Sequence, residues 1–258
     1  MPKLAANLSM LFGEVDFLER FGRAAAFGFK GVEYLFPYDY PAEQLAQKLR
    51  EHGLTQVLFN LPAGDWNAGE RGIAVLPDRV DEFQEGVGRA IEFAKALDCG
   101  QLNCLAGIRP AGVAEDALRR TLLENLRFAS DALGRENIRL LAESINTQDI
   151  PGFYLNGTAQ WLDLKARTGR DNLWMQYDIY HMQIMEGNLT RTIRDNLERI
   201  AHMQLADNPG RHEPGSGEIN YPNLLRFIDE AGYQGWIGCE YVPDGDTEAG
   251  LSWAAPYM

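Results

Sequence analysis

Short apolar runs alternate with longer amphipathic segments along the whole chain. The first run, Lys3–Met10, is followed by a segment at 16–28 that places Phe17 and Phe21 on one helical face. The predicted strands are Lys3–Met10, Gly31–Phe36, Thr55–Asn60, Gln101–Gly107, Ile138–Ile145, Leu173–Ile179, Ile200–Ala206 and Trp236–Tyr241. The predicted helices cover 16–28, 41–53, 77–98, 114–134, 158–169, 189–197 and 221–233, with a short helical tail from about Thr247.

Strict alternation of eight strands with helices indicates a parallel sheet, because every parallel connection needs a crossover that a helix provides. Eight such units in 258 residues fit closure into a barrel of roughly 250 residues better than an open sheet. No linker-like or low-complexity segment divides the chain. We therefore expect an α/β protein in which residues 1–258 form one domain, a single (β/α)8 TIM barrel.

The composition narrows the class of protein. The chain is 45% hydrophobic and 24% charged, so a large core is expected, and its net charge of -13 disfavours binding to nucleic acid or to an anionic membrane. The three cysteines, Cys99, Cys104 and Cys239, form no CxxC pair, which indicates small buried residues in a reducing compartment. No apolar run is long enough for a signal peptide or a membrane span, so a cytoplasmic location is expected. A homo-oligomer is compatible with the sequence.

Each of the last four predicted strands carries a polar residue at or near its exit. Glu143 and Asp178 end two of these apolar runs, and Gln204 and Glu240 occupy similar places in the other two. Because side chains alternate between the two faces of a strand, these residues share the face opposite the apolar set. In barrels of this type the functional residues lie at the carboxyl ends of the strands. We therefore expect the four residues to converge at one mouth of the barrel.

The same alternation assigns the other residues of the strand at 200–206. Ala201, Met203 and Leu205 should lie on the outer face under the helices, while His202 should point inward. His202 and Gln176 lie one layer deeper than the strand exits, which is typical of supporting or packing residues.

Three carboxylates in one pocket repel each other, and a divalent cation resolves the repulsion. Ligation by carboxylate and amide oxygens favours Mg2+ or Mn2+ over Zn2+. A single carboxylate at a strand end is more often part of a salt bridge or a helix cap, but its recurrence on consecutive strands favours a shared site. The sequence thus predicts a metal site made of Glu143, Asp178, Gln204 and Glu240.

Segments that follow the strands supply further polar residues. His181 lies three residues after Asp178 and is expected on a loop above the metal, where it could hydrogen-bond a substrate or shuttle a proton. The segments 61–72 and 209–220 each contribute an arginine, which could pair with a substrate carboxylate. Solvated charge on a flexible loop is the alternative interpretation. The candidate substrate contacts are His181, Glu70, Arg71, Arg211 and His212.

Several longer segments carry a family resemblance. "GVEYLFPYDY", "QYDIYHMQIMEGNLT", "HMQLADNPGRHEPGSGEINY" and "GYQGWIGCEY" resemble the hydroxypyruvate isomerase family, which belongs to the xylose-isomerase-like barrels. The match runs from the first strand to the last. The resemblance implies a metal bound by the same four strand-end residues, with Glu143 and Glu240 as the acid/base pair. Gln204 departs from the sugar epimerases of the superfamily, which usually have histidine at this position.

The resemblance also implies a reaction and a small hydroxy-keto acid substrate. Hydroxypyruvate and tartronate semialdehyde would interconvert through an enediolate, with one glutamate removing a proton from one carbon and the other delivering a proton to its neighbour. Other functions stay open on the sequence alone. They are a 2-oxo-tetronate isomerase, a sugar 3-epimerase, a metal-dependent phosphodiester hydrolase and a non-catalytic sugar-acid binding protein.

Overall fold

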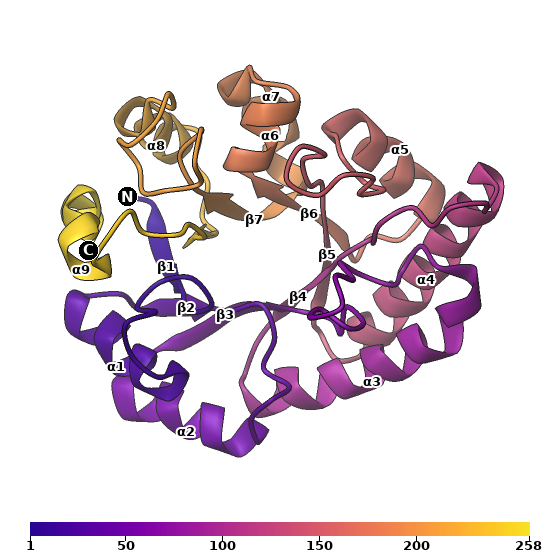
Figure 1. Ribbon diagram of the computed structural model, residues 1–258, viewed down its shortest axis with the longest axis horizontal. Helices are drawn as coiled ribbons and strands as arrows, with labels where there is room; N and C mark the ends of the chain where they lie inside the picture. The colour runs from indigo at the N-terminus through magenta and orange to yellow at the C-terminus, as the bar shows by residue number, and fades with distance from the viewer.

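The computed structural model describes residues 1–258, with eight parallel strands closed into a barrel and helices around the outside (Figure 1). Each strand is hydrogen-bonded to its neighbours in sequence, and β8 closes the barrel against β1. The strands are β1 Lys3–Asn7, β2 Gly31–Glu33, β3 Thr55–Asn60, β4 Gln101–Cys104, β5 Arg139–Glu143, β6 Leu173–Asp178, β7 Ile200–Leu205 and β8 Trp236–Cys239. The prediction of a single TIM barrel is therefore confirmed.

Nine α-helices accompany the strands, together with short 3-10 helices at Pro77–Arg79, Leu197–Arg199 and Leu251–Tyr257. The α-helices are α1 Phe17–Phe27, α2 Ala42–His52, α3 Val80–Ala96, α4 Glu115–Arg135, α5 Thr158–Thr168, α6 Ile179–Met185, α7 Leu189–Asn196, α8 Tyr221–Glu230 and α9 Thr247–Gly250. The ring that they form in Figure 1 covers the outer face of the barrel.

The main core lies between the strands and this ring of helices. On α4, Leu118, Leu122 and Leu126 recur at helical spacing and are buried. Trp161 of α5 is fully buried and donates a hydrogen bond from Nε1 to the main-chain oxygen of Ala142 on β5, 3.0 Å away. Because the helices hold the outward residues of each strand, the intervening residues must point into the barrel.

A smaller apolar cluster fills the lower interior of the barrel. Its buried members are Ala5, Val57, Leu58, Leu141 and Ala201. Ala5 on β1 and Leu141 on β5 each come two positions before the polar residue that ends the strand. The interior is therefore apolar toward the N-terminal end of the strands and polar toward the C-terminal end.

The assignment of Ala201 to the outer face was wrong. The register between β6 and β7 shifts, because Met175 pairs with Ile200 whereas the next residue, Gln176, pairs with His202. Ala201 is thus an extra residue in β7, and such a bulge interrupts the alternation of side chains. Its methyl group packs in the interior cluster instead of under the helices.

The first strand is shorter than predicted because the chain turns at its end. The predicted strand Lys3–Met10 stops at Asn7, whose main-chain oxygen accepts hydrogen bonds from the main-chain nitrogens of Met10 and Leu11. The Asn7 side chain accepts a further bond from the main-chain nitrogen of Ser9. A turn of this kind leaves little trace in the hydrophobic pattern.

Helix α6 was not predicted. Its sequence reads as the continuation of an apolar strand, yet the helix begins immediately after β6. Asp178 is the cap: its Oδ1 accepts hydrogen bonds from the main-chain nitrogens of Tyr180, at 2.8 Å, and His181, at 3.4 Å. One carboxylate therefore ends a strand and starts a helix.

All three cysteines are buried and free, as the sequence predicted. None of the helices combines the length and the apolar character that crossing a membrane requires.

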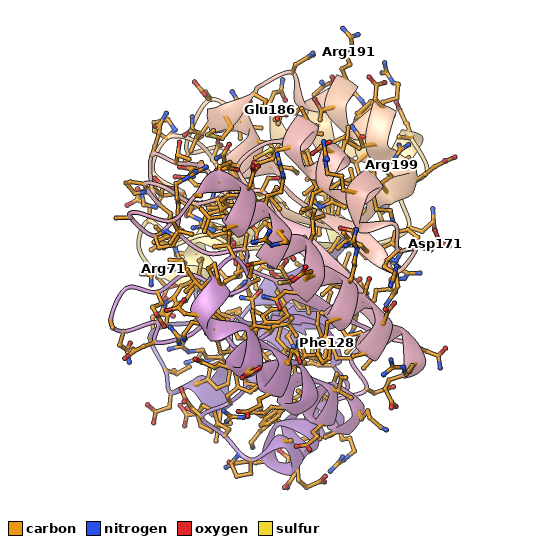
Figure 2. All side chains as sticks on the ribbon, turned by 90° about the vertical axis from the view of Figure 1, so that its right-hand side faces the viewer. Arg71, Phe128, Asp171, Glu186, Arg191 and Arg199 are labelled. Carbon is orange, nitrogen blue, oxygen red and sulfur yellow. The ribbon has the colours of Figure 1, made fainter.

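Leu126 and Phe128 provide a matched test of how α4 packs. Leu126 is 1% exposed, whereas Phe128 is 38% exposed and lies on the outer face of the helix (Figure 2). We expect Leu126→Ala to lower the free energy of unfolding by about 2–5 kcal/mol, because it leaves a cavity in the core. Phe128→Ala should change it by less than about 1 kcal/mol. Urea unfolding followed by circular dichroism measures both, and equal losses would contradict this packing.

Candidate active site

A cavity of about 280 Å³ lies at the C-terminal ends of the strands. Arg71, which lines it, lies in Figure 2 at the opposite side of the molecule from Asp171 and Arg199, which precede β6 and β7. The charged and amide side chains in the lining are Asn7, Glu33, Asn60, Arg71, Glu143, Asp149, Gln176, His181, Gln204, Arg211 and Glu240. The structure thus brings three of the four predicted strand-end residues into one cavity, and the fourth, Asp178, lies beside it.

Glu143 and Asp178 are buried carboxylates that both lie near the Nε2 atom of His181. Glu143 Oε2 accepts a hydrogen bond from Asn103 Nδ2 at 3.0 Å, and Glu143 Oε1 lies 3.8 Å from His181 Nε2. Asp178 Oδ2 is buried without a hydrogen bond and lies 3.5 Å from the same histidine nitrogen. One potential ligand atom from each of the three residues lies within 4.8 Å of the others. This buried group could hold a metal ion.

Glu240, directly after β8, is held by two donors. Its Oε1 accepts a hydrogen bond from Asn7 Nδ2 at 3.2 Å, and its Oε2 accepts one from Arg211 Nη2 at 2.5 Å. The same arginine nitrogen lies 3.7 Å from Asp178 Oδ2. A single guanidinium therefore serves two buried carboxylates.

Burial changes the proton affinities of the site. Burial raises the pKa of Glu240 to about 8, and Arg211 opposes this shift only in part. Burial, followed by the charges of Glu240 and Asp178, raises the pKa of Glu143 well above its usual range. Burial lowers the pKa of His181 to about 4, so its imidazole is neutral at pH 7. Three carboxylates, one of them with an oxygen that no donor satisfies, fit a divalent cation that prefers oxygen ligands.

Gln204 is anchored from below by two side chains. Its Nε2 donates to Glu33 Oε1 at 2.8 Å, and its Oε1 accepts from Gln176 Nε2 at 2.6 Å. Glu33 also accepts from Asn7 Nδ2 at 3.0 Å and lies 2.7 Å from His202 Nε2. Glu33 is buried, and a carboxylate only accepts hydrogen bonds. It therefore fixes the amides of Gln204 and Asn7 with their nitrogen atoms toward it.

The polar residues at the ends of the first four strands were not predicted. They are Asn7, Glu33, Asn60 and Asn103. Asn7, Glu33 and Asn60 end β1, β2 and β3, as Glu143 ends β5, so the comparison made for the second half of the chain would have found them in the first half. Asn103 and Asn7 supply the amide donors that hold the catalytic candidates Glu143 and Glu240.

His181 lies in the first turn of α6 rather than on a loop, because Asp178 starts a helix at this point. The ring is buried and lines the cavity. Its Nε2 faces Glu143 and Asp178, and its Nδ1 lies 2.7 Å from Asn146 Nδ2. The histidine is thus held from behind and directed at the carboxylates.

Arg71 and Arg211 both reach the cavity. The guanidinium of Arg71 lies 4.1 Å from the ring centroid of Trp66 and donates from Nη1 to the main-chain oxygens of Trp66 and Glu70. Its Nε and Nη2 hydrogens have no partner in the protein, in contrast to Arg211 Nη2, which is bound to Glu240.

The other two predicted contacts do not line the cavity. Glu70 forms an ion pair with Arg79, with 2.7 Å between Oε1 and Nη1, and accepts a hydrogen bond from the main-chain nitrogen of Asp65. His212 Nδ1 lies 2.8 Å from the main-chain oxygen of Val242. Both side chains tie neighbouring segments together at the rim of the barrel.

Comparison with known proteins agrees with this architecture. Residues 21–257 match the family described as "Xylose isomerase-like TIM barrel". The chain is 55% identical over 257 residues to hydroxypyruvate isomerase of Escherichia coli, covering 100% of both chains. It is 47% identical over 258 residues to the 2-oxo-tetronate isomerase of Pectobacterium atrosepticum, covering 100% of this chain and 98% of the relative. A crystal structure from Brucella melitensis, described as "AP endonuclease, family 2", matches with a TM-score of 0.97, 48% identity and 100% coverage of each chain.

Gly238 on β8 leaves the space that the Glu33 carboxylate occupies. A Cβ at this position would lie 2.2 Å from Glu33 Oε1. We expect Gly238→Ala to displace the carboxylate and to lower the free energy of unfolding by about 1–3 kcal/mol. The control is Gly88→Ala in α3, where nothing lies within 4 Å and alanine should stabilise the helix by up to about 1 kcal/mol. Thermal unfolding measures both, and a Gly238→Ala variant as stable as the native protein would contradict the close contact.

Proposed function

Because the chain belongs to the hydroxypyruvate isomerase family of xylose isomerase-like TIM barrels, we propose that it interconverts hydroxypyruvate and tartronate semialdehyde. It is an isomerase of the hydroxypyruvate or 2-oxo-tetronate isomerase type. The observation that carries the proposal is the pair of buried glutamates, Glu143 and Glu240, facing one cavity beside a neutral histidine and two arginines.

In the proposed reaction, one glutamate acts as the base and removes a proton from C3 of hydroxypyruvate. The electrons of the broken C–H bond form the C2=C3 double bond, and the former carbonyl oxygen gains the negative charge of an enediolate. The other glutamate acts as the acid and delivers a proton to C2. As the carbonyl forms at C3, the proton of the C3 hydroxyl is transferred to the oxygen on C2. Atoms and charge balance between the two three-carbon acids.

Glu143, Asp178, Gln204 and Glu240 are the proposed metal ligands, and Mg2+ or Mn2+ is the proposed ion. A bound divalent cation supplies positive charge near the two oxygens that share the enediolate charge. Residues of the chain bind and orient the substrate. Arg71 lines the cavity and has unpaired donors, so it suits the substrate carboxylate, whereas Nη2 of Arg211 is already bound to Glu240.

A 2-oxo-tetronate isomerase is the second candidate function. The 47% identity to such an enzyme over the full chain favours it, and the cavity of about 280 Å³ accommodates four carbons as well as three. The chemistry at the glutamates is the same for both substrates. The ratio of kcat/KM for hydroxypyruvate and for a 2-oxo-tetronate decides between them.

Replacing either glutamate tests the acid/base pair. We expect Glu143→Gln and Glu240→Gln each to lower kcat by roughly 10²–10⁴ fold, the usual loss when a general acid or base is removed. The control is Glu136→Gln, which affects only a surface ion pair with Lys95. Turnover of hydroxypyruvate is followed by proton NMR of both acids. Near-normal kcat in both cavity variants would remove the pair from the mechanism.

Chelation tests the proposed metal. We expect EDTA treatment to abolish turnover and added Mg2+ or Mn2+ to restore it, because the carboxylates need a compensating cation. Calorimetry should show Mn2+ binding to the native protein and weakened binding by at least about tenfold to Asp178→Asn. Asp131→Asn, at a surface ion pair with Arg170, is the control. Full activity in chelated protein, with no Mn2+ binding, would contradict the proposal.

A further inference from the structure

The side chain of Asn146, in the segment after β5, has only one workable orientation. It is fully buried, and its Oδ1 accepts hydrogen bonds from two main-chain nitrogens, those of Gln148 at 3.0 Å and Asp149 at 2.8 Å. A turned amide would direct its NH2 group at two N–H donors. The oxygen therefore faces the main chain, and the nitrogen faces the other way.

The Asn146 nitrogen has two hydrogens and two acceptors. Nδ2 lies 3.0 Å from Asp149 Oδ2, which also accepts from the hydroxyl of Tyr180 at 2.8 Å. It lies 2.7 Å from His181 Nδ1. Since the amide can only donate at this point, the Nδ1 atom of His181 must be the acceptor and cannot carry a hydrogen.

The proton of a neutral imidazole then resides on the other nitrogen, because the bond made by one ring nitrogen sets the state of the second. We infer that Asn146 is a positioning residue that fixes His181 as the Nε2–H tautomer, so that His181 offers the cavity a hydrogen-bond donor and not a metal-binding lone pair. His181 lies close enough to Glu143 and Asp178 to join a metal site by distance alone. The hydrogen bond behind the ring removes it from that site and leaves only oxygen ligands.

The Nε2–H group has no partner in the protein. It lies 3.5 Å from Asp178 Oδ2 and 3.8 Å from Glu143 Oε1, both longer than a normal hydrogen bond. A buried, unpaired donor in the lining of a cavity suits a ligand oxygen. Under the proposed function, on which this role rests, the ligand oxygen is one of the two that share the enediolate charge, and a fixed donor stabilises that charge as it develops.

The tautomer can be observed directly. In metal-free protein labelled with 15N-histidine and measured without substrate, long-range 15N–1H correlation spectra distinguish a protonated from a bare ring nitrogen. His181→Asn identifies the signals of His181 among the four histidines. We expect a protonated Nε2 and a bare Nδ1, unchanged on addition of Mg2+. A protonated Nδ1, or loss of the Nε2 proton when Mg2+ binds, would overturn the inference.

Asn146→Asp tests the positioning role, because it keeps the Oδ1 acceptor for the main chain and replaces the Nδ2 donor that serves His181 Nδ1 and Asp149 Oδ2. We expect His181 to change to the Nδ1–H tautomer and kcat to fall by roughly 10²–10³ fold, the usual loss for one such donor, with KM changed less. Asn156→Ala, in the same segment but bonded to the main-chain oxygen of Phe153, should leave the His181 signals unchanged. An unaltered tautomer in folded Asn146→Asp would refute the role of Asn146.

The two claims fail separately. The NMR measurement needs no substrate, so a protonated Nε2 in a protein that does not turn over hydroxypyruvate would leave the tautomer standing and refute the proposed function. An active enzyme with a protonated Nδ1 would refute the tautomer and leave the proposed function standing.

Discussion

Four carboxylates buried at one end of a barrel are the constraint on which the rest of this structure depends. Glu33, Glu143, Asp178 and Glu240 are each at most 5% exposed. An unpaired buried charge costs several kcal/mol, so each carboxylate must be compensated by donors that the fold places around it. The compensation comes from amides on adjacent strands, from the start of α6 and from one arginine.

The interior of the barrel has two parts. Toward the N-terminal end of the strands it is an apolar cluster that stabilises the fold. Toward the C-terminal end it is a polar network, and buried charges of this kind contribute little net stability. Networks of this kind specify geometry, because every amide next to a carboxylate has only one workable orientation. Glu33 orients Gln204 and Asn7, and Asn146 orients His181. The site is therefore organised by hydrogen-bond direction as much as by distance.

The barrel could be predicted from the sequence because the alternation of apolar strands and amphipathic helices is a property of single residues and their spacing. The strand-end residues could be located for the same reason. The bulge at Ala201 could not, since one inserted residue changes the face of a side chain without changing the hydrophobic pattern. Helix α6 was not predicted because its apolar residues continue the hydrophobic pattern of the preceding strand. Two further contacts could not be predicted, that of His202 with Glu33 and that of the Asn146 amide with His181. Each joins residues far apart in the chain.

The central claim is that carboxyl groups in this cavity move a proton between adjacent carbons of a small hydroxy-keto acid. Turnover of hydroxypyruvate in deuterated water, with the C2 position of tartronate semialdehyde observed by NMR at early times, tests it most directly. Transfer by two carboxyl groups that exchange with solvent predicts deuterium at C2 of the newly formed product. Quantitative retention of the original C3 hydrogen at C2 would mean a direct hydride shift and would contradict the account.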